Sequence, residues 1–430
     1  MNFMDHEVIR LVKKALQYLD RTQTICIECS SKVAPEIRAI LAVPAPLLRS
    51  FHLFSHGDGF EVDEGIFDGA MPNLQNVGLS SCTVDWSSPI FNGLTELALF
   101  GISRGTRGIV HGLILTLGRL PGLRRLELKD LFWKRRDIFT AGDIQNVDKV
   151  ALLKLKSSTL SDTAFWVTFL LAHLELPKSA TIYLTCVYAD EQDLSCFHPF
   201  TANKFSMGPG RPQSPAPHQP LRSLDILRCR SWNCESRWQV ACSTSNLVGD
   251  IAFSRLDPRF ALYFDLETDW DEIIAFFHIL PMENLDTIVM FGDYRVSHKC
   301  LWTEAFGNAP ELRVIRQKYI GANRLIHALQ PCHSTIFAPT LTDIEFKVID
   351  FDSGECRGED THPHGDGCLR CLHHASASRA EAGFMVQRLF LDDCNIVEDD
   401  ITKLAKVVGK VEWTPHKVNC TAIPCSLPHN

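Results

Sequence analysis

A six-residue pattern, Leu-x-x-Leu-x-Leu, recurs along most of the chain and constrains its fold more than any other feature. Apolar residues hold the first, fourth and sixth positions, as in Leu94-Leu97-Leu99 and Leu123-Leu126-Leu128. A unit of this kind buries one face of a single strand, and it does so only when neighbouring units stack against it. The other strong copies are Leu74-Val77-Leu79, Val150-Leu153-Leu155, Leu221-Leu224-Ile226, Leu285-Ile288-Met290, Leu341-Ile344-Phe346 and Val386-Leu389-Leu391.

Weaker copies fill much of the remaining sequence, and most steps between copies match the roughly 20–29 residues of a leucine-rich repeat. Helical periodicity occupies several intervals, at 109–118, 268–281 and 399–408. We therefore predict an α/β leucine-rich-repeat solenoid with irregular repeats over residues 1–413, a curved arc with parallel strands inside and helices and loops outside. The weaker copies are Thr22-Ile25-Ile27, Leu48-Phe51-Leu53, Ser179-Ile182-Leu184, Arg259-Leu262-Phe264, Leu312-Ile315 and Val408-Val411-Trp413.

Four segments depart from the repeat pattern. An amphipathic stretch at about 5–19 predicts a helix that caps the first strand. The segments at about 199–220, rich in proline and glycine, and 350–366, rich in glycine, aspartate and histidine, predict disordered inserts. Residues 414–430 are expected to form a flexible tail.

Charge and hydrophobicity along the sequence indicate which partners and which cellular compartment to expect. The formal net charge of −8 has no long run of one sign, so neither nucleic acid nor an anionic membrane is favoured. No segment approaches the ~18 uninterrupted apolar residues that span a bilayer. The N-terminal residues lack a secretory pattern, which predicts a cytoplasmic or nuclear protein with reduced thiols.

Two sets of cysteines have interpretable positions. Cys82, Cys229 and Cys394 each follow the last apolar residue of a repeat strand by three places, where a small side chain turns inward to satisfy the backbone. Cys26 and Cys29 form a Cys-x-x-Cys motif on a predicted strand, and residues three apart on a strand point to opposite faces. These thiols are therefore expected to be structural rather than redox-active.

One cluster has the residue types of a zinc site. Thiolates and imidazoles that lie close together can hold a tetrahedral zinc ion, and zinc binding through 356–374 is kept as an alternative. A single Cys-x-x-Cys stands alone here, however, and Leu369 and Leu372 also fit a helix that leads to Gly383. We predict no metal and no required cofactor. The low-ranking ligand candidates are Cys356, His362, His364, Cys368, Cys371 and His374.

The sequence matches none of the catalytic or nucleotide-binding motifs that its short segments suggest. His6-Glu7-Val8-Ile9-Arg10 begins like a zinc-protease motif, but Arg10 replaces the second histidine. The glycines between Gly101 and Gly112 match neither nucleotide-binding fingerprint, and Gly-x-Ser-x-Gly is absent. The chain is therefore not expected to be an enzyme.

The strand face that points away from the core is the remaining candidate site. Side chains alternate along a strand, so the residue between the last two apolar positions faces outward. These residues mix aromatic rings with charges of both signs, which favours recognition of protein partners; the alternative is a merely solvated face. They are His52, Gly78, Ala98, Glu127, Lys154, Tyr183, Asp225, Tyr263, Val289, Arg316, Glu345 and Phe390, and the predicted binding residues are Glu127, Lys154, Tyr183, Asp225, Tyr263, Arg316 and Phe390.

Several segments resemble the leucine-rich part of the large mushroom-type fungal family of F-box proteins. The resemblance lies in Ala45-Pro46-Leu47-Leu48-Arg49-Ser50-Phe51-His52-Leu53, in Leu123-Arg124-Arg125-Leu126-Glu127-Leu128 and in the closing stretch from Val386 to Trp413. It implies an arc that captures a substrate for ubiquitination, while an F-box docks onto the Skp adaptor and cullin.

The chain departs from that family at its start. An F-box of about 40–50 residues should precede the repeats, whereas Asp5 already begins repeat-like sequence. We therefore expect a non-catalytic protein-binding module without recruitment of the Skp adaptor, and keep the intact role of ubiquitin-ligase substrate receptor as an alternative.

Overall fold

The computed structural model is a mixed α/β protein whose strands form parallel sheets. Its contacts divide the chain into two compact units, Met1–Cys196 with Ala261–Leu266 (unit 1) and Phe197–Phe260 with Glu267–Asn430 (unit 2), and each is described by itself. The structure describes residues 10, 12–14, 17–56, 60–102, 109–131, 149–177, 179–187, 197, 200–201, 204, 220–230, 236–244, 262–267, 270–292, 301–318, 322–331, 336–351 and 368–415.

Unit 1 is built on a parallel sheet whose strands pair one after another. The order is β1-β2-β4-β6-β7-β9-β11-β14. The strands are β1 (Thr24–Ser30), β2 (Ser50–His56), β4 (Asn76–Ser80), β6 (Glu96–Phe100), β7 (Arg125–Lys129), β9 (Ser157–Thr163), β11 (Thr181–Val187) and β14 (Leu262–Glu267). The pattern residues of β2, β4, β6 and β7 are buried, including Phe51, Leu53 and Leu99 at 0% exposure. The expected strand phase is therefore confirmed for these repeats.

The backbone enters and leaves these strands in the same way each time. One carbonyl before each strand accepts two amides from the next repeat, as when Gln75 O accepts the Thr95 and Glu96 N–H groups at 2.8 and 3.0 Å. After β4, β6 and β7 the residues Ser81, Gly101 and Asp130 take positive φ values of 53°, 51° and 53°. Each donates its N–H at 2.8 Å to a carbonyl at or near the end of the neighbouring strand. Repeated sequence thus gives repeated turn geometry.

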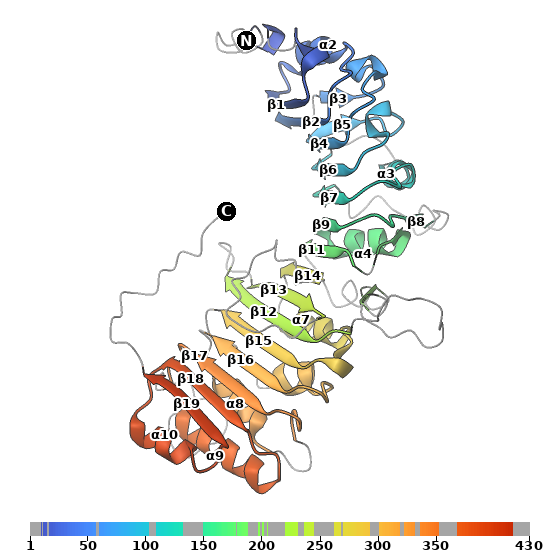
Figure 1. Cartoon of the computed structure of the whole chain (residues 1–430). Helices are drawn as coiled ribbons and strands as arrows, with labels where there is room; N and C mark the ends of the chain where they lie inside the picture. The colour runs from blue at the N-terminus through green and yellow to red at the C-terminus, as the bar shows by residue number, and fades with distance from the viewer. Residues whose placement is uncertain are drawn as a thin grey trace. The chain divides into compact units, whose positions relative to one another are not determined.

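Helices and short strands cover one side of the unit 1 sheet (Figure 1). Pro35 suits the first turn of α2 (Ala34–Leu41), and the buried stripe Val110, Leu113, Ile114 and Leu117 fixes α3 (Ile109–Gly118), as predicted. α4 (Ala164–His173) is mostly buried and contacts β9 and β11. The smaller elements are η1 (Leu19–Arg21), β3 (Phe60–Val62), η2 (Ile66–Gly69), β5 (Cys82–Val84), η3 (Pro89–Phe91), β8 (Val150–Ala151) and β10 (Leu174–Glu175).

Unit 2 has its own sheet, in the order β13-β12-β15-β16-β17-β18-β19. Every neighbouring pair is parallel except β12 with β13, which is antiparallel. The strands are β12 (Ser223–Arg230), β13 (Ser236–Ser243), β15 (Thr287–Gly292), β16 (Val314–Lys318), β17 (Asp343–Lys347), β18 (Arg388–Cys394) and β19 (Lys410–Pro415). After β17, Val348 has a φ of 53° and donates to Asp392 O, which repeats the turn of unit 1.

The helices of unit 2 follow its strands and pack on one another. They are α7 (Trp270–His278), η5 (Met282–Asn284), the π-turn η6 (Leu301–Ala305), α8 (Asn323–Leu329), α9 (Cys368–Glu381) and α10 (Glu398–Leu404). α8 packs against α9, and α7 against η6. α10 begins on three acidic residues, as an N-terminal turn favours, but ends at Leu404 instead of reaching Val408. Among the described helices, none combines the length and apolar character that crossing a membrane requires.

Two expectations about strand order are corrected. The sequence placed the strand at Arg259-Leu262-Phe264 between the copies at 221 and 285, whereas β14 pairs with β11 and β12 pairs directly with β15. The space beside β12 is taken instead by β13, an antiparallel strand that was not expected. Val240, Ala241 and Cys242 of β13 are fully buried, which gives this strand an apolar reason to join the sheet.

The segments outside the repeat pattern are partly ordered. Within the predicted insert 199–220, Thr201 is helical and buried and donates its hydroxyl to Ile279 O at 2.8 Å. Within 350–366, Phe351 is 1% exposed, packs edge-on against Phe346 at 5.5 Å, and donates its N–H to Asn395 Oδ1. The predicted tail 414–430 begins inside β19, which extends to Pro415. The rest of these segments, and most of the predicted capping helix at 5–19, lie outside the described residues.

Candidate interaction surface

The outward residues of unit 1 line up across its sheet. Strand register places Cys26, His52, Gly78, Ala98, Glu127, Thr159, Tyr183 and Tyr263 directly opposite one another in turn. We call this set the unit 1 face row. Directly opposite side chains lie about 4.5–5.5 Å apart at their β-carbons. The row therefore aligns residues from separate repeats along one line across the sheet.

One predicted member of this row is wrong. The copy Val150-Leu153-Leu155 was expected to form a sheet strand with Lys154 facing outward, but Lys154 lies in a turn and Leu153 is 66% exposed. The strand that pairs with β7 is β9, in which Ser158 and Leu160 are buried, and the buried Leu155 precedes it. Ser158 occupies a position where the repeat pattern has leucine, so a search for apolar residues does not recognise this repeat. Thr159 replaces Lys154 in the face row.

Unit 2 has an equivalent strip. Asp225, Val289, Arg316, Glu345, Phe390 and Glu412 follow one another in register across β12, β15, β16, β17, β18 and β19. We call this set the unit 2 face row. Val289 corrects the expectation of an outward, solvated residue, because it is only 3% exposed. Val289 stands directly opposite Arg316 on β16.

Ion pairs lie on the unit 2 face, three of them between neighbouring strands and one within β19. Arg316 Nε lies 3.0 Å from Glu345 Oε2, with the two side chains only 17% and 23% exposed. Arg388 Nε donates to Asp343 Oδ1, and this carboxylate is the main cause that raises the pKa of Arg388. Lys347 Nζ lies 3.0 Å from Asp392 Oδ2, and Lys410 Nζ 2.9 Å from Glu412 Oε1. The face is therefore dense in charge but largely neutral in sum.

A hollow of about 250 Å³ lies on the unit 2 face. Its floor includes Ile344 and Leu389, and its charged lining comes from strands β16 to β19. The lining residues are Val314, Arg316, Asp343, Ile344, Glu345, Arg388, Leu389, Phe390 and Glu412. This volume suits one side chain of a partner rather than a whole small-molecule ligand.

The unit 1 face carries its own polar contacts. Glu127 Oε1 lies 2.5 Å from Lys129 Nζ, and the same ammonium lies 5.2 Å from the centre of the Phe100 ring. Across β6 and β7, Arg125 Nη1 lies 3.8 Å from Glu96 Oε2. An aromatic ring, a cation and the Glu127 carboxylate thus meet where Glu127 was expected to face outward.

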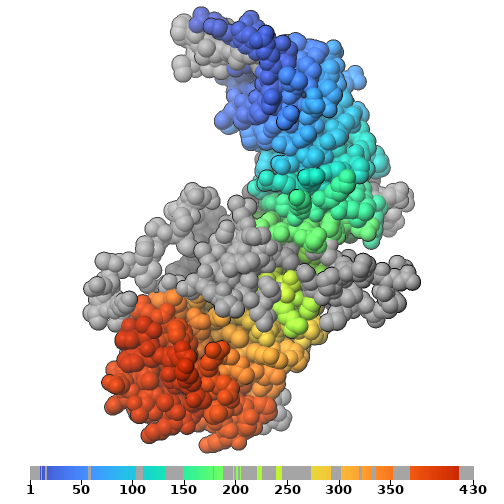
Figure 2. Space-filling model, in the orientation of Figure 1, coloured from blue at the N-terminus to red at the C-terminus, as the bar shows by residue number. Residues whose placement is uncertain are grey.

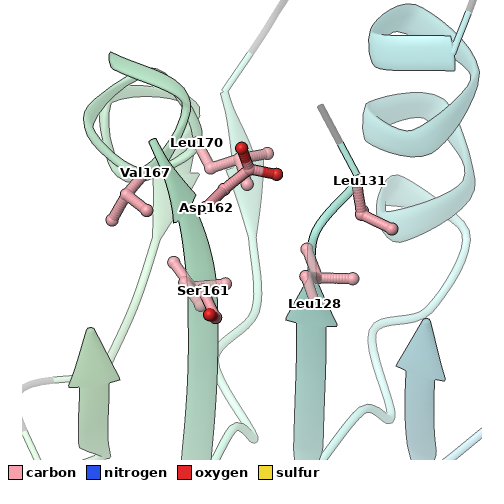
Figure 3. Close-up of a pocket in the computed structure, with 7 residues that line it drawn as sticks. Leu128, Leu131, Ser161, Asp162, Val167 and Leu170 are labelled. Carbon is pink, nitrogen blue, oxygen red and sulfur yellow. The ribbon is translucent and has the colours of Figure 1, made fainter. Parts of the chain in front are cut away.

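A second, much smaller pocket lies where β7 and β9 end (Figure 3). Leu128, Leu131, Val167 and Leu170 line it together with Asp162, and its volume is about 10 Å³. A space of this size holds at most a single water molecule. It offers no room for a substrate.

The cysteines of the repeat turns are buried, as expected. Cys82 Sγ donates to Ser80 O at 3.2 Å, and burial raises its pKa to about 12. Cys394 Sγ donates to Phe346 O at 3.5 Å, and burial raises its pKa to about 11. Cys229 lies on β12, and its side chain is outside the described residues. On β1, Cys26 is exposed and Cys29 buried, which confirms that the Cys-x-x-Cys thiols point to opposite faces.

The zinc candidates are divided between described and undescribed segments. Cys371 and His374 lie on α9, which confirms the helix predicted there, and Cys368 is its first residue. Cys356, His362 and His364 lie outside the described residues. Within the part of the chain that the structure describes, no three metal-ligating side chains gather at one place.

Comparisons with known proteins give limited information. No family model matches the chain, and no curated protein matches it. Among solved structures, it is similar to an internalin from Listeria monocytogenes at 12% sequence identity, with a TM-score of 0.28, over 95% of this chain and 94% of that one.

Proposed function

We propose that both units are arrays of irregular leucine-rich repeats that bind a protein partner through their strand faces, without catalysing a reaction. The support for the arrays is internal. In both units a backbone carbonyl just before a strand accepts hydrogen bonds from two amides of the next repeat. Gln75 O is an example in unit 1 and Arg313 O in unit 2. In the space-filling view, consecutive segments of unit 1 follow one another as bands, as expected when each repeat contacts its neighbours (Figure 2).

The single observation that carries the binding proposal is the make-up of the unit 2 face row. Arg316 and Glu345 are less than a quarter exposed, yet they lie beside Phe390 on the lining of a hollow. Ordered, half-buried charge next to an aromatic ring is typical of interface cores rather than of solvated surface. We propose that Glu127, Tyr183 and Arg316 contact the partner, together with Asp225 and Tyr263, which lie in register with the face rows.

The chemistry of the described thiols favours binding over catalysis. A nucleophilic cysteine needs a lowered pKa and access to solvent. Burial instead raises the pKa of Cys29, Cys82 and Cys394.

The finer role, capture of a substrate for a ubiquitin ligase, is supported by the resemblance of three segments to fungal F-box proteins. Those segments fall on β2, β7 and the stretch from β18 to β19. Purification of the chain from its source cells with the Skp adaptor at stoichiometric amounts would support this role. A purified partner complex without the adaptor would exclude it.

The binding proposal is tested by site-specific photo-crosslinking in the source cells. A benzophenone amino acid replaces Thr159 or Phe390 on the faces, and Leu115 on α3 or Val397 before α10 as controls, which are 55% and 63% exposed. We expect a discrete cross-linked protein from the face positions alone. Excess wild-type chain should suppress that product, whereas excess Arg316→Glu chain should suppress it less. Equal products from Leu115 and Val397 would contradict the proposal.

A further inference from the structure

The hollow of unit 2 has an unequal balance of charge. Two guanidinium groups line it, and each already has a carboxylate inside the same hollow, Arg316 with Glu345 and Arg388 with Asp343. Glu412 is the third lining carboxylate. Its ion-pair partner is Lys410, which is not a lining residue and is 67% exposed. The lining therefore carries three carboxylates against two guanidinium groups, and Glu412 is compensated by the exposed Lys410 and, more weakly, by the charge of Arg388.

Phe390 lies between two acidic neighbours in this hollow. Strand register places Glu345 directly opposite it on one side and Glu412 on the other. Each carboxylate is thus close enough to attract a cation placed over the ring.

Two other phenylalanines of these faces have a lysine directly opposite. Lys129 stands opposite Phe100, with its Nζ 5.2 Å from the ring centre. Lys318 stands opposite Phe291, with its Nζ 5.4 Å from the ring centre. Both are cation–π contacts between directly opposed residues. Phe390 has acidic residues where Phe100 and Phe291 have a lysine, so its directly opposite neighbours supply no cation to its ring.

We propose that this hollow receives an arginine or lysine side chain of the protein partner, with the cation over Phe390 and paired to Glu412. The inference rests on the proposed function and names the chemistry of its partner. Lys410 is the internal competitor, since it holds Glu412 until the incoming cation replaces it. A cation gains from the ring and from the carboxylate together, whereas an acidic side chain would meet three carboxylates.

The test uses the full chain with labelled methyl groups and small probes of defined charge. The methyls of Val314, Ile344 and Leu389 line the hollow and report on it by NMR. The probes are N-acetyl-argininamide, its neutral analogue N-acetyl-citrullinamide and the α-amide of N-acetyl-glutamate as an acidic probe. We expect saturable shifts with arginine and none with the other two. Methyls far from the hollow serve as the check that each variant keeps its fold.

Three variants sharpen the result. Glu412→Gln should weaken arginine binding by about threefold, and Phe390→Leu by a similar factor. Lys410→Gln should instead strengthen it by about twofold, because the competing ammonium is gone. If the hollow bound its ligand through apolar contacts alone, the methyl shifts would be the same with the arginine and citrulline probes. Neither Glu412→Gln nor Lys410→Gln would then change the affinity.

Each other outcome overturns the proposal: equal shifts with citrulline, tighter binding of the acidic probe, or no shift with any probe. Failure here is separable from failure of the proposed function. If the cross-linker at position 390 captures a protein while the methyl shifts do not change with arginine, only the proposal of a basic side chain is wrong. If the methyls respond but no face position cross-links a protein, the proposed function falls instead.

Discussion

The imidazole of His52 lies over Gly78, its directly opposite neighbour on the next strand of the unit 1 face row. A β-carbon built at Gly78 would lie 2.3 Å from His52 Nδ1, closer than real β-carbons approach other atoms. The ring is held by a 3.0 Å hydrogen bond between His52 Nε2 and Ser50 Oγ. Gly78 thus keeps the space that lets this histidine lie flat along the face.

Replacing Gly78 with Ala tests that relationship. The methyl group must displace the His52 ring and break its hydrogen bond to Ser50, which should cost about 1 kcal/mol of unfolding free energy. In a His52→Ala background the same change should be neutral or stabilising by up to about 1 kcal/mol, because alanine is the better strand residue. A double-mutant cycle by urea denaturation measures this coupling, and additive effects would rule it out.

Ser158→Ala should make the protein more stable. Ser158 holds an inward leucine position of β9 at 0% exposure, and its Oγ has no hydrogen-bond partner among the described residues. Removing a buried unpaired hydroxyl should raise the unfolding free energy by about 1 kcal/mol. Ser157→Ala, one residue earlier on the half-exposed side, is the matched control and should change it by less than about 0.5 kcal/mol. A destabilised Ser158→Ala chain would show that the hydroxyl is satisfied.

Thiol alkylation should separate the two cysteines of the Cys-x-x-Cys motif. Iodoacetamide at pH 8 should modify the exposed Cys26 in the native chain and spare Cys29, Cys82 and Cys394, because burial raises the pKa of these three. Peptide mass spectrometry before and after denaturation gives the readout. Fast native labelling of Cys82 or Cys394 would contradict the assigned burial.

The raised pKa values of these thiols make the free energy of unfolding depend on pH. A thiol whose folded pKa lies above its unfolded value favours folding in its protonated form, so its contribution is complete below about pH 9. That contribution should be lost as pH rises toward the folded values of about 11 for Cys394 and about 12 for Cys82. Cys82→Ala should reduce the loss of stability between pH 9 and 11, measured against wild type in the same urea series. An unchanged slope would exclude Cys82 as a contributor.

Arg379 on α9 holds a buried turn in place. It is 0% exposed, and its guanidinium donates to Phe337 O at 2.7 Å and to Ala338 O at 2.9 Å. Burial lowers its pKa to about 10, and Ala338 has a φ of 46°. Arg379→Ala should cost about 3 kcal/mol, since it leaves two carbonyls unpaired and a void. Arg370→Ala, on the exposed side of the same helix, should cost less than about 1 kcal/mol.

The parallel strands were predictable because their physics is local. In β7, Leu126 and Leu128 alternate with charged residues, and this alternation fixes which side of the strand is buried. The turns could be anticipated for the same reason, since Cys82 and Cys394 mark them with small inward side chains.

What the sequence missed depends on partners far along the chain. A hydrophobic pattern selected Leu153 over Ser158, although pairing with β7 places Ser158 inside. Strand β13 joins its sheet only because β12 lies beside it, which periodicity within 236–243 does not reveal. For the candidate surface, the outward residues Glu127 and Arg316 were identified correctly, but the ion pairs and the hollow around Phe390 required the register between strands.

The central claim is that consecutive residues of one strand serve opposite purposes, one in the core and the next on the binding face. It is tested most directly by the unfolding free energies of Leu126→Ala and Glu127→Ala, measured by urea denaturation. Leu126 is 2% exposed, so its truncation should cost about 2–5 kcal/mol. Glu127 loses only a half-exposed ion pair with Lys129 and should cost less than about 1 kcal/mol. Equal losses at both positions would contradict the account.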